Sequence, residues 1–331
     1  MKKLVATATI ALGLSAGGAM AGECGDIVMA EFNWASGELM ANVDKIILEE
    51  GYGCNVELVI GGTTAIFASM NEKGTPQIAG EQWVNALREL LDPAMAEGRL
   101  HAVNTAPIMG LGEGWWMPPY TKAAHPELKT VLDWIEHPEL FPSAEDPSKG
   151  AFVGCPAGWG CQHVNLNLFN AFDMEAKGWV LIDPGSAAGL DGSIAKANER
   201  EENWLGYYWS PTSMIGKYNM QPVPWGVDYA GNDHWDACIS QEDCADPQQT
   251  SWIQSEVFTI VTDEFMETGG EINDYLAARV FTGEAMGSML VYMADEQAAG
   301  EDAAVEFLIQ YEDLWTNWVS EEVAAKIKAA L

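Results

Sequence analysis

Short apolar runs alternate with amphipathic, helix-like stretches through the first hundred residues. Three of the runs indicate buried strands: 25–32 (GDIVMAEF), 55–60 (NVELVI) and 76–80 (PQIAG). Ser36 is a fair N-cap for a helix that continues through Glu50, and Gly51 ends it. The turn Gly61-Gly62-Thr63-Thr64 opens another helix. Strands that alternate with helices predict an α/β lobe with a mostly parallel sheet.

Two Pro- and Gly-rich passages divide the remaining chain, at 107–120 (PIMGLGEGWWMPPY) and 222–226 (PVPWG). Further strand-like runs lie between and after them, at 151–154, 204–209 and 257–262, and a long helical tail follows. We therefore expect two lobes joined by two crossings, with strand ends pointing into the cleft between them. The expected boundaries are 22–116 and 222–331 for lobe I and 117–221 for lobe II.

Residues 1–21 have the pattern of a secretory signal peptide. Two lysines are followed by an apolar run and by Ala-Met-Ala, which predicts cleavage after Ala21. The apolar run is shorter than the roughly 20 residues that cross a bilayer. Cys24 leaves a lipoprotein as the alternative, but Glu23 stands where a lipidation signal carries a small residue. We expect an exported, periplasmic protein.

The charge balance excludes one class of partner. The chain has 49 Asp and Glu against 16 Lys and Arg, a net charge of -33. Such a chain repels nucleic acid and anionic lipid surfaces. A solvated acidic surface of this kind suits salty surroundings.

Six cysteines remain after the expected cleavage: Cys24, Cys54, Cys155, Cys161, Cys238 and Cys244. An even number in an exported chain indicates disulfides, although many pairings are conceivable. Proximity favours Cys155–Cys161 and Cys238–Cys244, and neighbouring parallel strands would bring Cys24 to Cys54. A zinc site is the alternative, but the chain has no C-x-x-C and only five His.

The placement of the tryptophans suggests a ligand site. The chain has 14 of them, and six follow strands or lie in the first crossing: Trp34, Trp83, Trp115, Trp116, Trp159 and Trp209. In open α/β sheets ligands bind outside the carboxyl ends of the strands. Indole faces are the best partners for cation–π contacts. Other tryptophans lie in helical or flanking stretches and are interpreted as core: Trp134, Trp179, Trp252, Trp315 and Trp318.

Acidic and polar residues accompany these tryptophans. Glu31, Glu81, Glu113 and Ser36 are therefore candidate ligand contacts, although each Glu could instead be a structural hydrogen-bond acceptor. A carboxylate or phosphate ligand would require Lys or Arg, and the cleft motifs contain neither. The pattern favours a ligand with a cationic group.

An ordered set of motifs resembles a known family over nearly the whole mature chain. The motifs are Asn33-Trp34-Ala35-Ser36, Gly51-Tyr52-Gly53, Glu81-Gln82-Trp83, Gly114-Trp115-Trp116-Met117-Pro118-Pro119-Tyr120, Pro156-Ala157-Gly158-Trp159 and Gly206-Tyr207-Tyr208-Trp209-Ser210-Pro211. They resemble the substrate-binding proteins of quaternary amine ABC importers of the glycine betaine, choline and trimethylamine N-oxide type.

The resemblance implies a type II periplasmic-binding-protein fold that closes by hinge motion around an aromatic cage. Carried over by position, the cage would be Trp34, Trp83, Trp159 and Trp209, with Trp116 or Trp115 as a further wall. The implied partners are a small methylated amine and an ABC permease in the inner membrane. No cofactor is implied, and we expect a monomer.

The acidic cleft motifs place trimethylamine N-oxide slightly ahead of glycine betaine as the expected ligand. Choline, dimethylsulfoniopropionate and a carbohydrate remain alternatives. An enzyme is not expected, because neither G-x-S-x-G nor H-E-x-x-H occurs. A sensory module that feeds a chemoreceptor would use the same closure, so the sequence leaves transport and sensing open.

The segment 228–249 (DYAGNDHWDACISQEDCADPQQ) departs from the family pattern and is rich in side-chain oxygens. Asp228, Asn232, Asp233 and Asp236 are candidate ligands for a structural Ca²⁺. Their spacing does not match an EF-hand, so a solvated acidic loop is the alternative.

Overall fold

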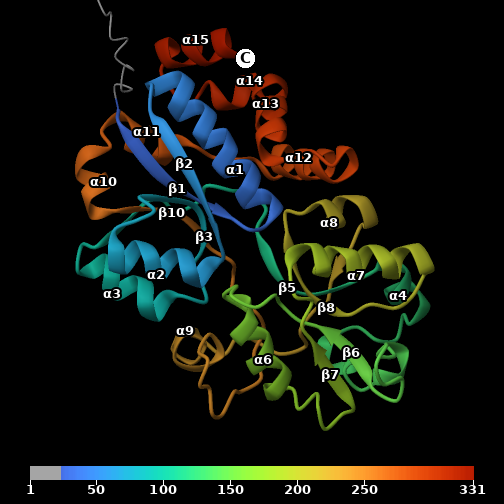
Figure 1. Cartoon of the computed structure of the whole chain (residues 1–331). Coiled ribbons are helices and arrows are strands. Elements are labelled where there is room, and N and C mark those ends of the chain that lie inside the picture. The colour runs from blue at the N-terminus through green and yellow to red at the C-terminus, as the bar shows by residue number, and fades with distance from the viewer. Residues whose placement is uncertain (1–23) are drawn as a thin grey trace, which may run out of the picture.

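The computed structural model describes residues 24–331 (Figure 1). The signal peptide expected over residues 1–21 lies outside the described part of the chain. Within residues 24–331, no helix combines the length and the apolar character that crossing a membrane requires.

The chain forms two five-stranded sheets, each flanked by helices. The first has the order β2-β1-β3-β10-β4. Its strands are β1 (Asp26–Phe32), β2 (Asn55–Gly61), β3 (Ile78–Trp83), β4 (Leu100–Asn104) and β10 (Val257–Thr262). β1 runs parallel to β2 and β3, whereas β10 is antiparallel to β3 and β4. We call this sheet with its helices lobe I.

The second sheet has the order β7-β6-β8-β5-β9. Its strands are β5 (Gly112–Met117), β6 (Gly150–Val153), β7 (Trp179–Ile182), β8 (Gly206–Ser210) and β9 (Gln221–Pro222). β6 is parallel to β7 and β8, and β5 is antiparallel to β8 and β9. We call this sheet with its helices lobe II.

The helices complete the two lobes. Lobe I has α1 (Ala35–Ile46) with the π-helical turn η1 (Ile47–Gly51), α2 (Thr63–Lys73), α3 (Arg88–Ala96), α10 (Asp263–Thr268), α11 (Glu271–Ala278), α12 (Gly283–Glu296), α13 (Gly300–Gln310), α14 (Glu312–Trp315) and α15 (Glu321–Ala330). Lobe II has α4 (Pro119–Ala124), α5 (Val131–Trp134), the 3₁₀ turn η2 (Pro138–Leu140), α6 (Cys161–Ala171), α7 (Ala187–Arg200) and α8 (Ser213–Tyr218).

This architecture confirms the predicted two-lobed α/β fold and corrects several details. Both sheets are mixed, because the strand that enters each one after a crossing runs antiparallel to its neighbours. Much of the expected first crossing is the strand β5, which lies whole in the second sheet. We therefore propose that lobe II begins before Gly112, whereas the expected boundary at 116 would divide this strand. Trp34 rather than Ser36 occupies the N-cap position of α1.

Residues 223–256, which we call the strap, return the chain from β9 to β10. They contain α9 (Asn232–His234) and the π-helical turn η3 (Trp235–Ile239). The Asn85 side chain of lobe I donates to Gln254 O and accepts from Glu256 N. On the lobe II side, the Asn167 amide donates to three strap carbonyls, those of Cys238, Ile239 and Gln241. Two asparagines thus hold the strap against both lobes.

All six cysteines form disulfides, in the expected pairing. Cys24–Cys54 joins cysteines that precede neighbouring parallel strands, and Cys155–Cys161 and Cys238–Cys244 join cysteines close in sequence. The first joins the starts of β1 and β2. The second closes the turn before α6, and the third closes a loop in the strap. Because no free thiol is left, the zinc alternative is wrong.

A buried ion pair joins α1 to the sheet of lobe I. Arg279 Nη1 donates to Asp44 Oδ2 at 2.9 Å, and both side chains are fully buried. Arg279 Nη2 also donates to Gly80 O of β3 and to Thr259 Oγ1 of β10. Burial raises the pKa of Asp44 while the Arg279 charge opposes that rise. The pair therefore connects three elements at one point.

Removing one member of this pair should destabilise the protein. Arg279→Met leaves Asp44 buried without its counter-charge, which costs about 3–5 kcal/mol in comparable sites. We expect a loss of that size in the free energy of unfolding, measured by urea denaturation. The double variant Arg279→Met with Asp44→Leu should recover much of it, because no lone charge remains. A single variant as stable as the wild type would contradict this account.

Candidate functional site

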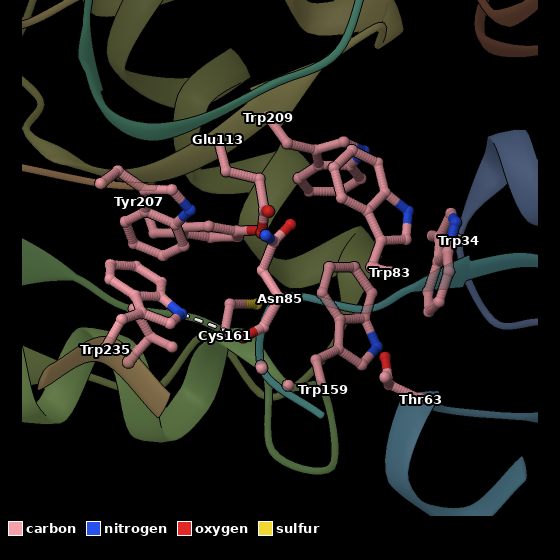
Figure 2. A pocket seen from close by; sticks show the side chains of 14 residues that line it. Trp34, Thr63, Trp83, Asn85, Glu113, Trp159, Cys161, Tyr207, Trp209 and Trp235 are labelled. Carbon is pink, nitrogen blue, oxygen red and sulfur yellow. Dashed lines mark hydrogen bonds between the residues drawn. The ribbon is translucent and has the colours of Figure 1, made fainter. Parts of the chain in front are cut away.

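A cavity lined by residues of both lobes and the strap lies between the two sheets (Figure 2). Its volume, counted as the space open to the centre of a water molecule, is about 30 Å³. Its lining residues are Trp34, Thr63, Trp83, Asn85, Ala86, Glu113, Trp159, Gly160, Cys161, Val164, Tyr207, Trp209, Trp235 and Trp252. Aromatic rings dominate this lining, and it contains no Lys, Arg or His.

Four indoles form one end of the cavity (Figure 2). Trp34 and Trp83 come from lobe I, and Trp159 and Trp209 come from lobe II. The Trp34 and Trp159 rings meet edge to face with centroids 5.1 Å apart, and Trp159 and Trp209 do so at 5.2 Å. Neighbouring walls are therefore nearly perpendicular. We call these four residues the cage.

Local structure explains why each cage indole lies at the cavity. Trp34 follows β1 directly and precedes α1, and Trp83 is the last residue of β3. Trp159 lies in the turn that the Cys155–Cys161 disulfide closes. Trp209 lies near the end of β8, where its ring stacks on that of Tyr207 two residues earlier. All four are thus at or beyond the carboxyl ends of strands, as the sequence predicted.

Glu81 lies behind the lobe I half of the cage and is almost fully buried, with 1% of its surface exposed. Its Oε1 accepts hydrogen bonds from Trp34 Nε1 at 2.9 Å, Ser36 Oγ at 2.8 Å and Trp83 Nε1 at 3.0 Å. One carboxylate oxygen therefore sets the orientation of two cage indoles.

Glu113 is the acidic group of the cavity itself. From β5 its side chain reaches the space beside Trp209 and Asn85 (Figure 2). Its Oε1 accepts from Tyr207 OH at 2.9 Å and its Oε2 from Ser255 Oγ at 3.2 Å. Desolvation outweighs these hydrogen bonds and raises the pKa of Glu113 to about 7. Near neutral pH this carboxyl can therefore either donate a proton to a hydrogen bond or accept one.

The two lobes touch beside the cage. Trp159 Nε1 of lobe II donates to Asn33 Oδ1 of lobe I at 2.8 Å. Thr64 Oγ1 donates to Gly158 O at 3.4 Å in the same region. A Cβ on Gly62 would stand 2.9 Å from Gly158 O, so glycine permits this close approach. The structure therefore shows the lobes closed over the cage.

The far end of the cavity contains residues that the sequence did not single out. Trp235 and Trp252 of the strap form this wall, and Trp235 Nε1 donates to Asn85 O at 2.9 Å (Figure 2). The Trp252 indole N–H is buried and makes no hydrogen bond of normal geometry, although it lies near enough to Glu113 to lower the pKa of that carboxyl. The interpretation of Trp252 as core is therefore incomplete, because this residue also lines the cavity. Tyr207 could be predicted from its two-residue spacing to Trp209, which places both side chains on one face of a strand.

Several expected site residues do not line the cavity. Trp115 is buried inside lobe II, where it packs on Phe152 and donates to Asn165 of α6. Trp116 is its neighbour in β5, not a residue of an open crossing. Glu31 lies outside the cavity and accepts from Asn42. Ser36 and Glu81 lie behind the cage and contact each other.

The carboxylates in the acidic segment of the strap do not lie close together. Over residues 24–331, no group of three or more His, Cys, Asp or Glu side chains lies close enough together to hold a metal ion. Asn232 Oδ1 accepts instead from Tyr229 OH. The Ca²⁺ site expected at Asp228, Asn232, Asp233 and Asp236 is therefore not confirmed.

Comparison with known proteins gives one family and several similar folds. The family model described as the substrate binding domain of ABC-type glycine betaine transport system matches residues 25–310. An ABC-transporter choline binding protein in complex with choline has 15% identity and a TM-score of 0.73 over 93% of this chain and 98% of its own.

Two further solved structures are similar to this fold. The glycine/betaine/L-proline-binding protein ProX from Borrelia burgdorferi has 16% identity and a TM-score of 0.71 over 91% of this chain and 99% of its own. Lactococcal OpuAC, closed on glycine betaine, has 16% identity and a TM-score of 0.66 over 89% and 99%.

The hydrogen bond between the lobes should contribute to ligand affinity. Asn33→Ala leaves the Trp159 indole N–H without its acceptor only when the lobes are closed. An unpaired buried donor costs about 1–3 kcal/mol, so we expect the Kd for the cavity ligand to rise by about 5-fold to 150-fold in calorimetric titration. Gln162→Ala is the matched control, because Gln162 binds Gly158 N within lobe II. Equal Kd values for both variants would argue against this role for Asn33.

Proposed function

The chain belongs to the family of substrate-binding domains of ABC-type glycine betaine transport systems, and from that premise we propose that its cavity captures trimethylamine N-oxide. The family binds small quaternary amines and delivers them to a membrane permease, and it is a family of transport proteins rather than enzymes. Import rather than sensing is part of the proposal. The carbohydrate alternative has no support in this family.

The cage suits the methylated end of the ligand. Four indole faces surround one end of the cavity, and each contributes about 0.5–2 kcal/mol toward a methylammonium group, depending on desolvation. Methyl groups also gain from leaving water when the lobes close. Trp34, Trp83, Trp159 and Trp209 are the proposed contacts. Trp115 and Trp116 are not, because they lie outside the cavity.

The position of Glu113 in the cavity is the observation that favours trimethylamine N-oxide over the other methylated amines. Glycine betaine would bring a carboxylate into a lining without Lys, Arg or His and beside this acid. Two carboxyl groups in one site repel each other unless one is protonated. Trimethylamine N-oxide needs only one donor for its oxygen, and protonated Glu113 supplies it. The small cavity agrees with this ligand, because its oxygen is bonded directly to nitrogen without an intervening carbon chain.

Choline is the second candidate, and the same residue supports it. Ionised Glu113 would accept a hydrogen bond from the choline hydroxyl and would attract its net positive charge. Since the pKa of Glu113 is near 7, both forms of the carboxyl are available. The two ligands therefore require opposite protonation states of one side chain.

A titration panel tests the ligand class. We expect refolded, ligand-free protein to bind trimethylamine N-oxide more tightly than glycine betaine or choline in calorimetry, with maltose silent. Trp159→Ala and Trp209→Ala should each weaken binding by about tenfold or more, because each removes an indole face and opens the cage to water. Circular dichroism controls for the fold. Wild-type affinity in both variants would remove the cage from the binding mechanism.

The pH dependence of affinity tests the role of Glu113. If its proton is donated to the N-oxide, the contribution of Glu113 to affinity is full below a pKa of about 7 and is lost as pH rises through it. Affinity for choline would instead increase over the same rise in pH, because choline binds ionised Glu113. Glu113→Gln keeps a neutral donor that does not titrate, so the loss of N-oxide affinity with rising pH should be absent from this variant between about pH 6 and pH 8. Glu31→Gln, outside the cavity, is the control and should keep the wild-type profile.

A further inference from the structure

Glu81 is a buried acid whose hydrogen bonds are confined to one of its oxygens. Oε1 accepts from two cage indoles and from Ser36, as described above, whereas Oε2 is buried without any partner. A core acid that served packing alone would leave neither an orphaned oxygen nor an uncompensated charge. The arrangement requires an explanation beyond holding two rings in place.

We propose that Glu81 is a positioning residue and the counter-charge of the cage, acting on the methylated cation through the indoles of Trp34 and Trp83. It does not line the cavity. This inference rests on the proposed function only in requiring an occupant with a methylated, positively charged centre.

The surrounding charges leave this role open to a ligand. The protein cation that influences Glu81 is Arg279, and its guanidinium is already paired with Asp44. Glu113, the other acid near the cage, lies in the cavity and carries the same sign. A buried carboxylate without a counter-charge of its own is stabilised by any positive charge that binds nearby. The cage is where the ligand would bring one.

The two indoles transmit the effect. Both N–H groups donate to Glu81 Oε1. Both rings line the cavity (Figure 2). A negative charge at the N–H edge of a ring adds electron density to the face, and cation–π attraction arises from that density. Trp159 has the neutral Asn33 amide as its acceptor, so the lobe I walls differ electrostatically from this lobe II wall.

The protonation of Glu81 should therefore be linked to ligand binding. Burial raises its pKa to about 7 against the three hydrogen bonds and the Arg279 charge, which lower it. A bound cationic centre favours the ionised form, so binding should release a proton from Glu81 near neutral pH, and Glu113→Gln protein isolates this release from the proton that the N-oxide would hold on Glu113. Oε2 can take up or lose that proton while the hydrogen bonds to Oε1 persist.

A comparison of two ligands of the same shape, one with a positively charged nitrogen and one with carbon in its place, isolates this role. Trimethylamine N-oxide and tert-butanol share a skeleton, but tert-butanol has carbon in place of the charged nitrogen. We expect Glu81→Gln to lower the affinity for the N-oxide by about tenfold and the affinity for tert-butanol by less than about threefold, measured by calorimetry and by competition. An equal loss for both ligands would overturn the counter-charge role and leave Glu81 a structural residue.

Ser36→Ala is the matched control at a pH well above the Glu81 pKa, because it removes one hydrogen bond to the same oxygen while the carboxylate stays ionised. We expect it to change the two affinities by the same factor. Should Glu81→Gln fail to fold, the pH series answers the question in Glu113→Gln protein, where Glu81 is intact. Preference for the N-oxide over tert-butanol should be full above the Glu81 pKa and fall as pH drops through it. A preference that does not change with pH would overturn the proposal.

Choline and 3,3-dimethyl-1-butanol, a second charged and neutral pair, separate this inference from the choice of ligand. If choline binds and the N-oxide does not, the proposed ligand is wrong, and the role of Glu81 is decided by the choline pair. If both methylated ammonium compounds bind and Glu81→Gln weakens the binding of each by the same factor as that of its carbon analogue, only the inference about Glu81 fails. If neither methylated ammonium compound binds, both proposals fail.

Discussion

The buried guanidinium of Arg279 is the contact on which the lobe I half of the site depends. It binds Asp44 of α1, Gly80 O of β3 and Thr259 of β10. α1 follows Trp34 directly, and β3 continues from Gly80 into Glu81 and Trp83. A charge buried this deeply is tolerated only when its partners are fixed, so the three elements cannot shift independently. The half-cage of lobe I is therefore built on a rigid base.

The cage is divided between two lobes, so the full set of indole contacts, and with it the ligand affinity, depends on closure of the lobes. Lobe I supplies two indoles oriented by Glu81, and lobe II supplies Trp159 on a disulfide-closed turn and Trp209 on a strand. Contacts across the gap, such as Trp159 with Asn33, exist only when the lobes meet. Closure removes water from the ligand, which strengthens each cation–π contact. The strap closes the far end with Trp235 and Trp252.

Much of the site could be predicted from local sequence. Trp34, Trp83, Trp159 and Trp209 each follow or end a strand, and parallel strands bring their carboxyl ends to one edge. For Trp115 and Trp116 the prediction from local sequence was wrong. Their Pro- and Gly-rich surroundings suggested an open crossing, whereas this segment pairs with β8 and forms a strand. Glu31, a candidate ligand contact, does not line the cavity, and its side chain accepts a hydrogen bond from Asn42 instead.

The sequence by itself determined the alternation of strands and helices, the pairing of nearby cysteines and the aromatic character of the site, because these follow from local periodicity and short separations. Only the tertiary structure decided which oxygen meets which indole. Glu81 lies 45 or more residues from Trp34 and Ser36, and Glu113 meets Ser255 across 142 residues. Contacts over such separations depend on how two sheets and the strap pack, and no local pattern encodes that packing.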